Sequence, residues 1–290
     1  RSLPISLPYQ DRTVSKSKIK RRLYFMLYTR TGKLLPWGTL TGIRPTKIAM
    51  SRLEDGWKEE DVRNYMRQMY LTGQEKLDLS VEIAARELKL LEPLNYEKGY
   101  SLYVGIPFCP TTCLYCSFTS YPIGKWKGRT GEYLAALFKE MEYTAEKMKG
   151  RPLDTIYFGG GTPTSLDAED LDKLLTKLWE TFPVDQALEF TVEAGRPDSI
   201  TREKLEVLKR HGVTRISINP QTMKQETLDI IGRHHTVDMV KDTFAMAREI
   251  GFDNINMDLI IGLPKETSED VRATMEEVKK LGPDSITVHS

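Results

Sequence analysis

Residues 103–116 read Tyr-Val-Gly-Ile-Pro-Phe-Cys-Pro-Thr-Thr-Cys-Leu-Tyr-Cys, a strand-like apolar run followed at once by a cysteine loop. The loop holds all three cysteines of the 290-residue chain, Cys109, Cys113 and Cys116. Thiolates spaced C-x3-C-x2-C can reach three corners of one cubic iron–sulfur cluster, which normally takes four ligands. Because the fourth iron has no cysteine, the pattern predicts a 4Fe–4S cluster with one iron open to a chelating molecule such as S-adenosylmethionine.

Other uses of three cysteines fit this spacing less well. A structural zinc site needs four ligands, usually as two separated pairs, and the four histidines stand far downstream, at positions 211, 234, 235 and 289. A disulfide would leave one thiol unpaired. Buried structural cysteines are common, but they have no reason to gather within eight residues with none elsewhere. We therefore expect all three to be metal ligands.

The composition is that of a globular protein, with 40% apolar and 29% charged residues. A net charge of +1 gives no drive toward nucleic acid or anionic membranes. No apolar run approaches the length of a membrane span and no leader is visible, so we expect a cytoplasmic protein without either partner. The chain begins with arginine and stops at Ser290 after a strand-like run, so we expect a fragment whose C-terminal domain lies beyond Ser290.

Residues 1–98 predict a smaller N-terminal accessory domain of α+β type. The apolar run at 23–28 predicts a strand, and residues 59–69 and 74–91 have helical periodicity. Residues 37–47 have the composition of a loop, with two glycines, a proline and two basic side chains. This segment either contacts substrate carboxylates or forms a turn that docks the accessory domain.

Residues 99–290 alternate short apolar strands with amphipathic helices, which predicts parallel βαβ units. The six expected strands are 102–106, 155–158, 188–192, 215–218, 256–261 and 285–288, and the expected helices are 130–149, 167–182, 201–210, 226–231, 237–250 and 269–281. Periodicity leaves open whether the strands form a partial barrel or an open doubly wound sheet. In both architectures a ligand binds at the C-terminal ends of the strands.

Glycine-rich and charged segments follow these strands. Gly159-Gly160-Gly161-Thr162 follows the second strand, and consecutive glycines let the backbone approach a ligand closely. The segment lacks the lysine and ending of a nucleotide-binding P-loop. Glu193, after the third strand, is either an acceptor for an ammonium or ribose hydroxyl or a charge at the start of a helix. Asp258, inside the fifth strand, needs a partner for its charge.

The Cys109/Cys113/Cys116 triplet resembles the signature of radical S-adenosylmethionine (radical SAM) enzymes. The wider string Tyr-Val-Gly-Ile-Pro-Phe-Cys resembles the branch that contains oxygen-independent coproporphyrinogen III oxidase and its relatives. The resemblance covers about residues 98–290 and implies an α/β fold with a partial (β/α)6 barrel. It implies that S-adenosylmethionine is bound by Tyr103, Tyr115, Gly160, Gly161, Thr162, Glu193, Gln221, Arg233 and Asp258. Tyr103 also matches a tyrosine tied to cofactor or substrate handling, which predicts a catalytic role, the alternative being an ordinary strand aromatic.

The resemblance implies an oxidoreductase of haem biosynthesis that decarboxylates coproporphyrinogen III to protoporphyrinogen IX, with flavodoxin or ferredoxin as reductant. Three departures keep other tetrapyrrole functions open. Gly105 stands where a histidine is frequent, Cys116 is followed by Ser117-Phe118-Thr119 without a further cysteine, and the N-terminal domain is longer than usual. The alternatives are a haem-binding chaperone of the same family and a radical SAM enzyme acting on haem or another tetrapyrrole.

Overall fold

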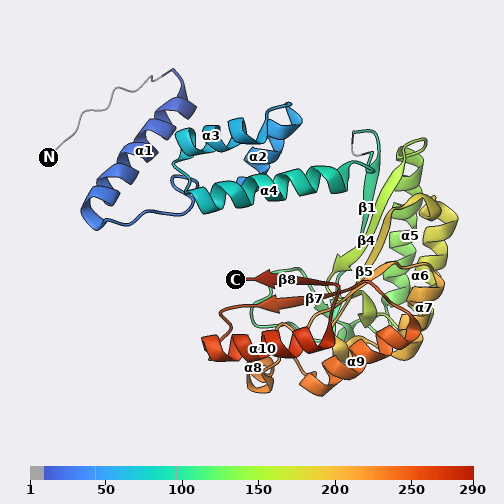
Figure 1. Cartoon of the computed structure of the whole chain (residues 1–290). Coiled ribbons are helices and arrows are strands. Elements are labelled where there is room, and N and C mark those ends of the chain that lie inside the picture. Colours follow the sequence, from blue (N-terminus) through green and yellow to red (C-terminus); the bar gives the residue numbers. More distant parts are fainter. Residues whose placement is uncertain (1–9, 43, 96) are drawn as a thin grey trace. The chain divides into compact units, whose positions relative to one another are not determined.

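The computed structural model describes residues 10–42, 44–95 and 97–290 (Figure 1). The chain divides into two compact units, Arg1–Pro93 and Leu94–Ser290. The sequence placed this boundary between residues 98 and 99, and the roles of the two parts as separate domains stay a prediction. No helix among the described residues is both long and apolar enough to cross a membrane.

The larger unit is built on one sheet of six parallel strands, ordered β1-β4-β5-β6-β7-β8 (Figure 1). The strands are β1 (Tyr100–Ile106), β4 (Leu153–Gly160), β5 (Glu189–Gly195), β6 (Arg215–Ile218), β7 (Ile255–Ile260) and β8 (Ser285–His289). A separate short pair, β2 (Phe108–Cys109) and β3 (Tyr121–Pro122), brackets the cysteine loop. All six predicted strands are present, and the sheet confirms the α/β prediction.

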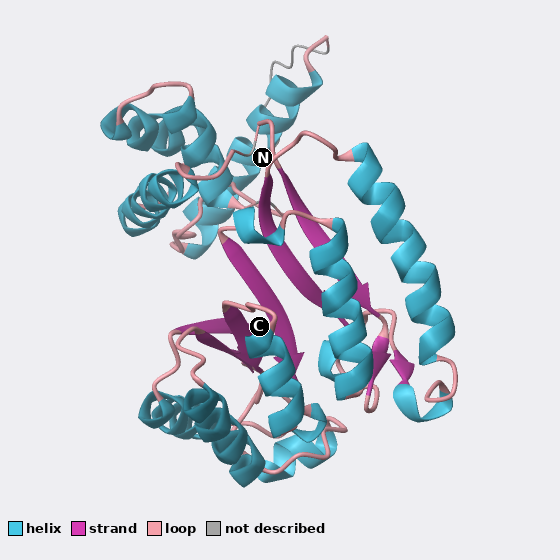
Figure 2. Ribbon diagram, turned by 90° about the vertical axis from the view of Figure 1, so that its right-hand side faces the viewer, coloured by secondary structure: helices cyan, strands magenta, loops and turns pink. Residues whose placement is uncertain are grey.

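Helices alternate with these strands and cover one face of the sheet (Figure 2). They are α5 (Thr130–Lys147), α6 (Ala168–Thr181), α7 (Arg202–Arg210), α8 (Gln225–Ile230), α9 (Val237–Ile250) and α10 (Ser268–Leu281). The described residues of this unit also form single 3-10 turns, η1 (Ile123–Lys125), η2 (Pro163–Ser165), η3 (Val184–Gln186) and η4 (Pro197–Ser199). Helix α10 begins with a capping box, in which Thr267 and Asp270 each accept a hydrogen bond from the other's backbone N–H.

The two faces of the sheet differ because strand side chains alternate in direction. Val104, Phe158 and Val192 are buried in the apolar core shared with the helices. The opposite face is polar: Thr155 donates to Ser101 at 2.8 Å, and Ser285 donates to Asn256 at 2.8 Å. The apolar face packs against the helices, and the polar face presents hydrogen-bonding side chains that can contact a ligand.

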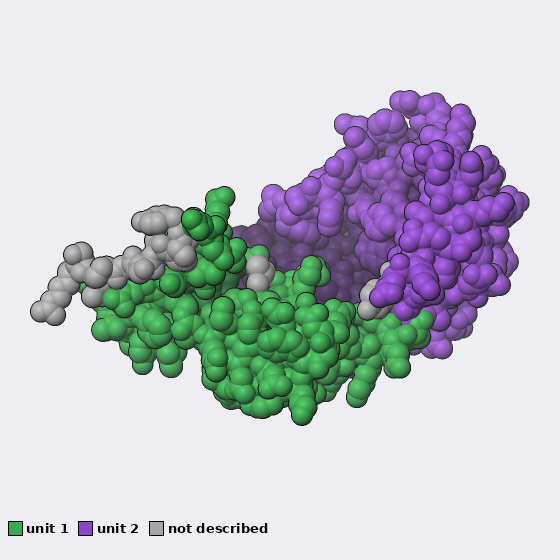
Figure 3. Space-filling view, turned by 90° about the horizontal axis from the view of Figure 1, so that it is seen from above, with its two compact units in different colours: residues 1–93 green, residues 94–290 purple. Residues whose placement is uncertain are grey.

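The smaller unit is coloured green in Figure 3. It is helical, with α1 (Arg12–Thr31), α2 (Pro45–Glu54), α3 (Glu59–Tyr70) and α4 (Gln74–Leu91) (Figure 1). Its apolar core consists of Ala49, Val62, Met66, Leu77, Val81 and Ala84. The prediction of an α+β accessory domain was wrong, because residues 23–28 lie inside α1 and no strand occurs among the described residues of this unit. Asp11 caps the first turn of α1, and Gly32 ends the helix in the left-handed conformation. Residues 23–28 therefore lie within one long helix. A six-residue apolar run cannot by itself distinguish strand from helix.

Candidate functional site

The cysteine loop leaves β1 at the C-terminal edge of the sheet, and its three cysteines are unpaired and half-buried. Two hydrogen bonds tie the loop to the segment after α8: Leu114 N–H donates to Ile231 O at 3.0 Å, and Thr111 Oγ1 donates to Gly232 O at 3.0 Å. Burial raises the pKa of the Cys109 thiol. The loop is therefore anchored by contacts with a distant part of the chain.

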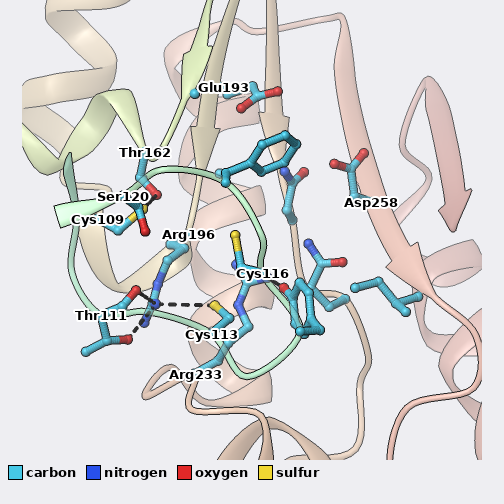
Figure 4. A pocket seen from close by; sticks show the side chains of 18 of the residues that line it. Cys109, Thr111, Cys113, Cys116, Ser120, Thr162, Glu193, Arg196, Arg233 and Asp258 are labelled. Atoms are coloured by element: carbon cyan, nitrogen blue, oxygen red, sulfur yellow. Dashed lines mark hydrogen bonds between the residues drawn. The ribbon is translucent and has the colours of Figure 1, made fainter. Parts of the chain in front are cut away.

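A cavity of about 340 Å³ lies against this loop (Figure 4). All three cysteines line it, together with residues at or beyond the C-terminal ends of β4, β5, β6, β7 and β8. The remaining lining residues are Thr111, Tyr115, Ser117, Phe118, Ser120, Gly160, Gly161, Thr162, Glu193, Gly195, Arg196, Asn219, Gln221, Arg233, Asp258, Ile260 and His289. Of the predicted site residues, all but Tyr103 line this one cavity.

The glycine turn after β4 packs directly on the start of the cysteine loop. Gly161 N–H donates to Ile106 O and Thr162 N–H donates to Phe108 O, both at 2.7 Å. A Cβ atom on Gly161 would lie 2.6 Å from Phe108 O and 2.9 Å from Ile106 O. Gly160 has φ +102°, a conformation that side chains rarely adopt. These two N–H donors are therefore used within the protein and are not available to a ligand.

Glu193 ends a row of polar groups on the inner face of the sheet. It accepts a hydrogen bond from the Tyr157 hydroxyl, and the Tyr157 ring stacks on Tyr103 with centroids 5.8 Å apart. Burial raises the pKa of Glu193, the Tyr157 hydrogen bond lowers it, and the charge of Asp258 raises it further. Tyr103 is 60% exposed and reaches the cavity only through this row. Its catalytic role stays a prediction.

Gln221 and Asp258 are joined through the backbone. Gln221 N–H donates to Asp258 O, and Ile260 N–H donates to Gln221 O, both at 3.0 Å. This isolated parallel bridge prolongs the sheet past the end of β6. Gln221 adopts φ +67°, which is uncommon for a residue with a side chain. The Asp258 carboxylate accepts from Asn256 Nδ2 at 2.7 Å, the partner that a charge inside a strand requires.

Three buried polar atoms around the cavity have no hydrogen-bond partner among the described residues: Gln221 Oε1, Asn219 Oδ1 and Arg233 Nε. Arg233 also donates to the Tyr115 hydroxyl at 3.2 Å, and burial raises the pKa of Tyr115 to about 12. Buried polar groups without partners cost free energy, so such a cluster indicates a polar ligand.

Arg196 is a site residue that sequence reasoning missed. It is 3% exposed and donates to both oxygens of Asp198, at 2.9 and 2.7 Å. Burial by itself lowers the pKa of Arg196 and raises the pKa of Asp198. The ion pair outweighs burial in both, so the pKa of Arg196 is raised and the pKa of Asp198 is lowered. The available signal was the Gly195-Arg196-Pro197-Asp198 segment at the end of a predicted strand.

The adjacent histidines differ in exposure. His234 is exposed and His235 is fully buried, and neither lines the cavity. Burial lowers the pKa of His235 to about 4, and the positive charge of Arg233 adds to this shift. Both ring nitrogens of His235 lack a partner among the described residues. His289 does line the cavity, at the end of β8.

The donor set fits a cluster rather than a single ion. No three His, Cys, Asp or Glu side chains in the described part of the chain converge closely enough for one metal ion. A cubic cluster takes each thiolate at a different iron, so its three cysteine ligands need not meet at one point. The unpartnered polar atoms and the carboxylates that line the cavity fit a zwitterionic nucleoside ligand beside it.

Comparison with known proteins identifies the family. A model of the Radical SAM superfamily matches residues 103–278. The chain belongs to the radical SAM superfamily. Membership implies a 4Fe–4S cluster and S-adenosylmethionine, and the chain has the three cysteines at 109, 113 and 116.

Two curated relatives from Bacillus subtilis (strain 168) resemble this radical SAM chain. The oxygen-independent coproporphyrinogen-III oxidase-like protein HemZ is 46% identical over 269 residues, covering 91% of this chain and 54% of the relative. The heme chaperone HemW is 41% identical over 191 residues, covering 66% of this chain and 50% of the relative. The chain thus spans about half the length of these relatives.

Among solved structures, coproporphyrinogen III oxidase (HemN) from Escherichia coli aligns with a TM-score of 0.60 at 32% identity. The alignment covers 67% of this chain and 44% of that chain. It confirms that the six-stranded sheet is the partial barrel of radical SAM proteins.

Proposed function

We propose that this chain is the core of a radical SAM oxidoreductase that decarboxylates two propionate side chains of coproporphyrinogen III, giving protoporphyrinogen IX. The observation that carries the proposal is the single cavity in which three free cysteines meet the glycine turn, Glu193, Arg233 and Asp258. The names of the HemZ and HemN relatives support the choice of substrate.

In this proposal each residue acts by binding or positioning. Cys109, Cys113 and Cys116 hold the cluster, and the Gly160 and Gly161 carbonyls accept from the ammonium of S-adenosylmethionine. When bound, the cluster would supply an electron that comes from flavodoxin or ferredoxin, and S-adenosylmethionine would supply the group that abstracts hydrogen. Each propionate would lose one hydrogen atom to that group, then release CO2 and pass one electron to a one-electron acceptor, which leaves a vinyl group.

Other residues would orient the nucleoside. The carboxylates of Glu193 and Asp258 are acceptors for ribose or amino donors, and Arg233 is a donor for a carboxylate. The unpartnered Gln221 Oε1 and Arg233 Nε supply two further polar contacts. Tyr103 would act from the wall of the barrel, through its stack on Tyr157.

Cluster binding is tested by Cys113→Ala, with Thr112→Ala as the matched control. Thr112 lies in the same loop but is exposed. After anaerobic reconstitution with iron and sulfide, Cys113→Ala should lose most of the brown absorbance and bound iron, whereas Thr112→Ala should retain both. Equal iron in both variants would show that Cys113 is not a ligand.

The reaction is tested on full-length reconstituted protein with reductant, S-adenosylmethionine and coproporphyrinogen III. We expect 5′-deoxyadenosine and protoporphyrinogen IX to rise together, two equivalents to one, by mass spectrometry. Deoxyadenosine without the porphyrin product would reject this substrate.

A haem chaperone is the second candidate. The 41% identity to HemW and the absence of a further cysteine in Ser117-Phe118-Thr119 favour it. It requires tight haem binding and no substrate-dependent consumption of S-adenosylmethionine. A radical SAM enzyme that opens the haem ring would instead consume haem and release a linear tetrapyrrole.

A further inference from the structure

Arg196 brings a buried guanidinium to the cysteine loop (Figure 4). Its NH1 donates to Thr111 Oγ1 at 2.7 Å and to Thr111 O at 3.2 Å, and it lies 3.8 Å from Cys113 Sγ. Thr111 and Cys113 are separated from Arg196 by more than 80 residues, so the arginine joins the end of β5 to the loop. Cys109 Sγ instead accepts a hydrogen bond from a neutral group, Thr162 Oγ1, at 3.5 Å.

The nitrogen atoms of the Arg196 guanidinium have two sets of partners. Nε and NH2 are occupied by Asp198, which fixes the orientation of the group, and NH1 is left to face the loop. Lysine cannot make both sets of contacts because its ammonium is a single point donor on a flexible stem. The Arg196 side chain is 4% exposed and that of Asp198 17%, so water and salt screen their charges poorly.

A cation and an N–H donor beside a cluster thiolate stabilise the reduced state. Reduction adds one negative charge to the cluster, and hydrogen bonds to the ligating sulfurs and nearby charges set its potential. The nearby Asp198 carboxylate acts in the opposite sense. Arg196 and Asp198, whose charged groups lie 2.7 Å apart, therefore have opposite effects on the reduction potential of the cluster. Arg196 is the member of the pair that contacts the sulfur.

We infer that Arg196 is a positioning residue that holds the cysteine loop through Thr111 and raises the reduction potential of the cluster through the Cys113 thiolate, with Asp198 limiting this effect. The inference rests on the proposed cluster at the three cysteines but not on the proposed substrate. It makes the electron transfer that starts the reaction depend on a side chain of the β5–α7 connection.

The test is a dithionite titration of the reconstituted full-length protein without substrate, with the reduced cluster followed by electron paramagnetic resonance. Arg196→Gln should disfavour reduction by about tenfold, which for a one-electron couple is about 59 mV more negative. Asp198→Asn should shift the potential in the positive direction. Arg202→Gln is the matched control, because Arg202 is the first residue of α7, is half-exposed and pairs with Glu249 at the surface.

Opposite shifts in the two variants, with Arg202→Gln at the wild-type value, would support the inference. An unchanged potential in either variant, or shifts of the same sign, would overturn it. If Arg196→Gln binds less cluster, the potential of the bound fraction and the Asp198→Asn result still decide. A wild-type protein that takes up no cluster would instead refute the proposed function, so the two failures are distinguishable.

Discussion

Replacing Gly161 by alanine should displace the start of the cysteine loop. The new Cβ would lie 2.6 Å from Phe108 O and 2.9 Å from Ile106 O, and both contacts are to backbone that cannot swing aside. Overpacking of this kind costs about 1–3 kcal/mol. The same displacement would strain two backbone hydrogen bonds, from Gly161 to Ile106 and from Thr162 to Phe108. Each contributes about 0.5–1.5 kcal/mol to stability. We therefore expect a loss of roughly 2–4 kcal/mol.

The assay is urea unfolding of the metal-free chain by far-UV circular dichroism, paired with bound iron after reconstitution. Gly131→Ala is the matched control, because Gly131 lies in α5 and a Cβ there meets nothing within 4 Å. The control should be neutral or up to about 1 kcal/mol more stable, since alanine favours the helix. If Gly161→Ala unfolded like wild type and bound equal iron, the close packing of the turn on the loop would not explain the glycine.

His235 should destabilise the metal-free chain in acid. Its pKa of about 4 in the folded protein lies below the value of 6.5 in the unfolded chain, so the unfolded state binds the proton first as the pH falls. The free energy of unfolding should therefore decrease between pH 6.5 and about 4, by roughly 3 kcal/mol. His235→Leu should flatten this part of the profile, and an unaltered slope would contradict the assignment. Thr267→Ala should cost about 0.5–2 kcal/mol through loss of the α10 cap, whereas an effect below that range would show the capping box to be dispensable. Leu174→Ala should cost about 2–5 kcal/mol in urea unfolding, because Leu174 is fully buried in α6, and a smaller loss would mean that the core collapses around it.

The strands and helices of the larger unit could be predicted because each short apolar run was followed by an amphipathic helix. The predicted helix at 237–250 and the predicted strand at 215–218 match α9 and β6 at both ends. The cavity followed from the same pattern, since parallel strands bring their carboxyl ends to one edge. Glu193 and Asp258 both line it, although 65 positions separate them in the chain.

Two features could not be read from the sequence. The run at 23–28 has the composition of a strand, and only the caps at Asp11 and Gly32 place it within one helix. The contact of Arg196 with Cys113 depends on the path of the loop, which is set by hydrogen bonds to Ile231 and Gly232 far along the chain. No local pattern encodes such long-range contacts.

The left-handed backbone of Gln221 has a consequence for protein engineering. A non-glycine residue in this conformation costs about 1 kcal/mol, and the two hydrogen bonds to β7 lock it in place. Glycine would relieve that strain while keeping both backbone bonds. A library screened for heat resistance alone would therefore enrich Gln221→Gly and remove a side chain that lines the cavity. Thermostable clones of this protein should be sequenced at position 221 before their ligand binding is measured.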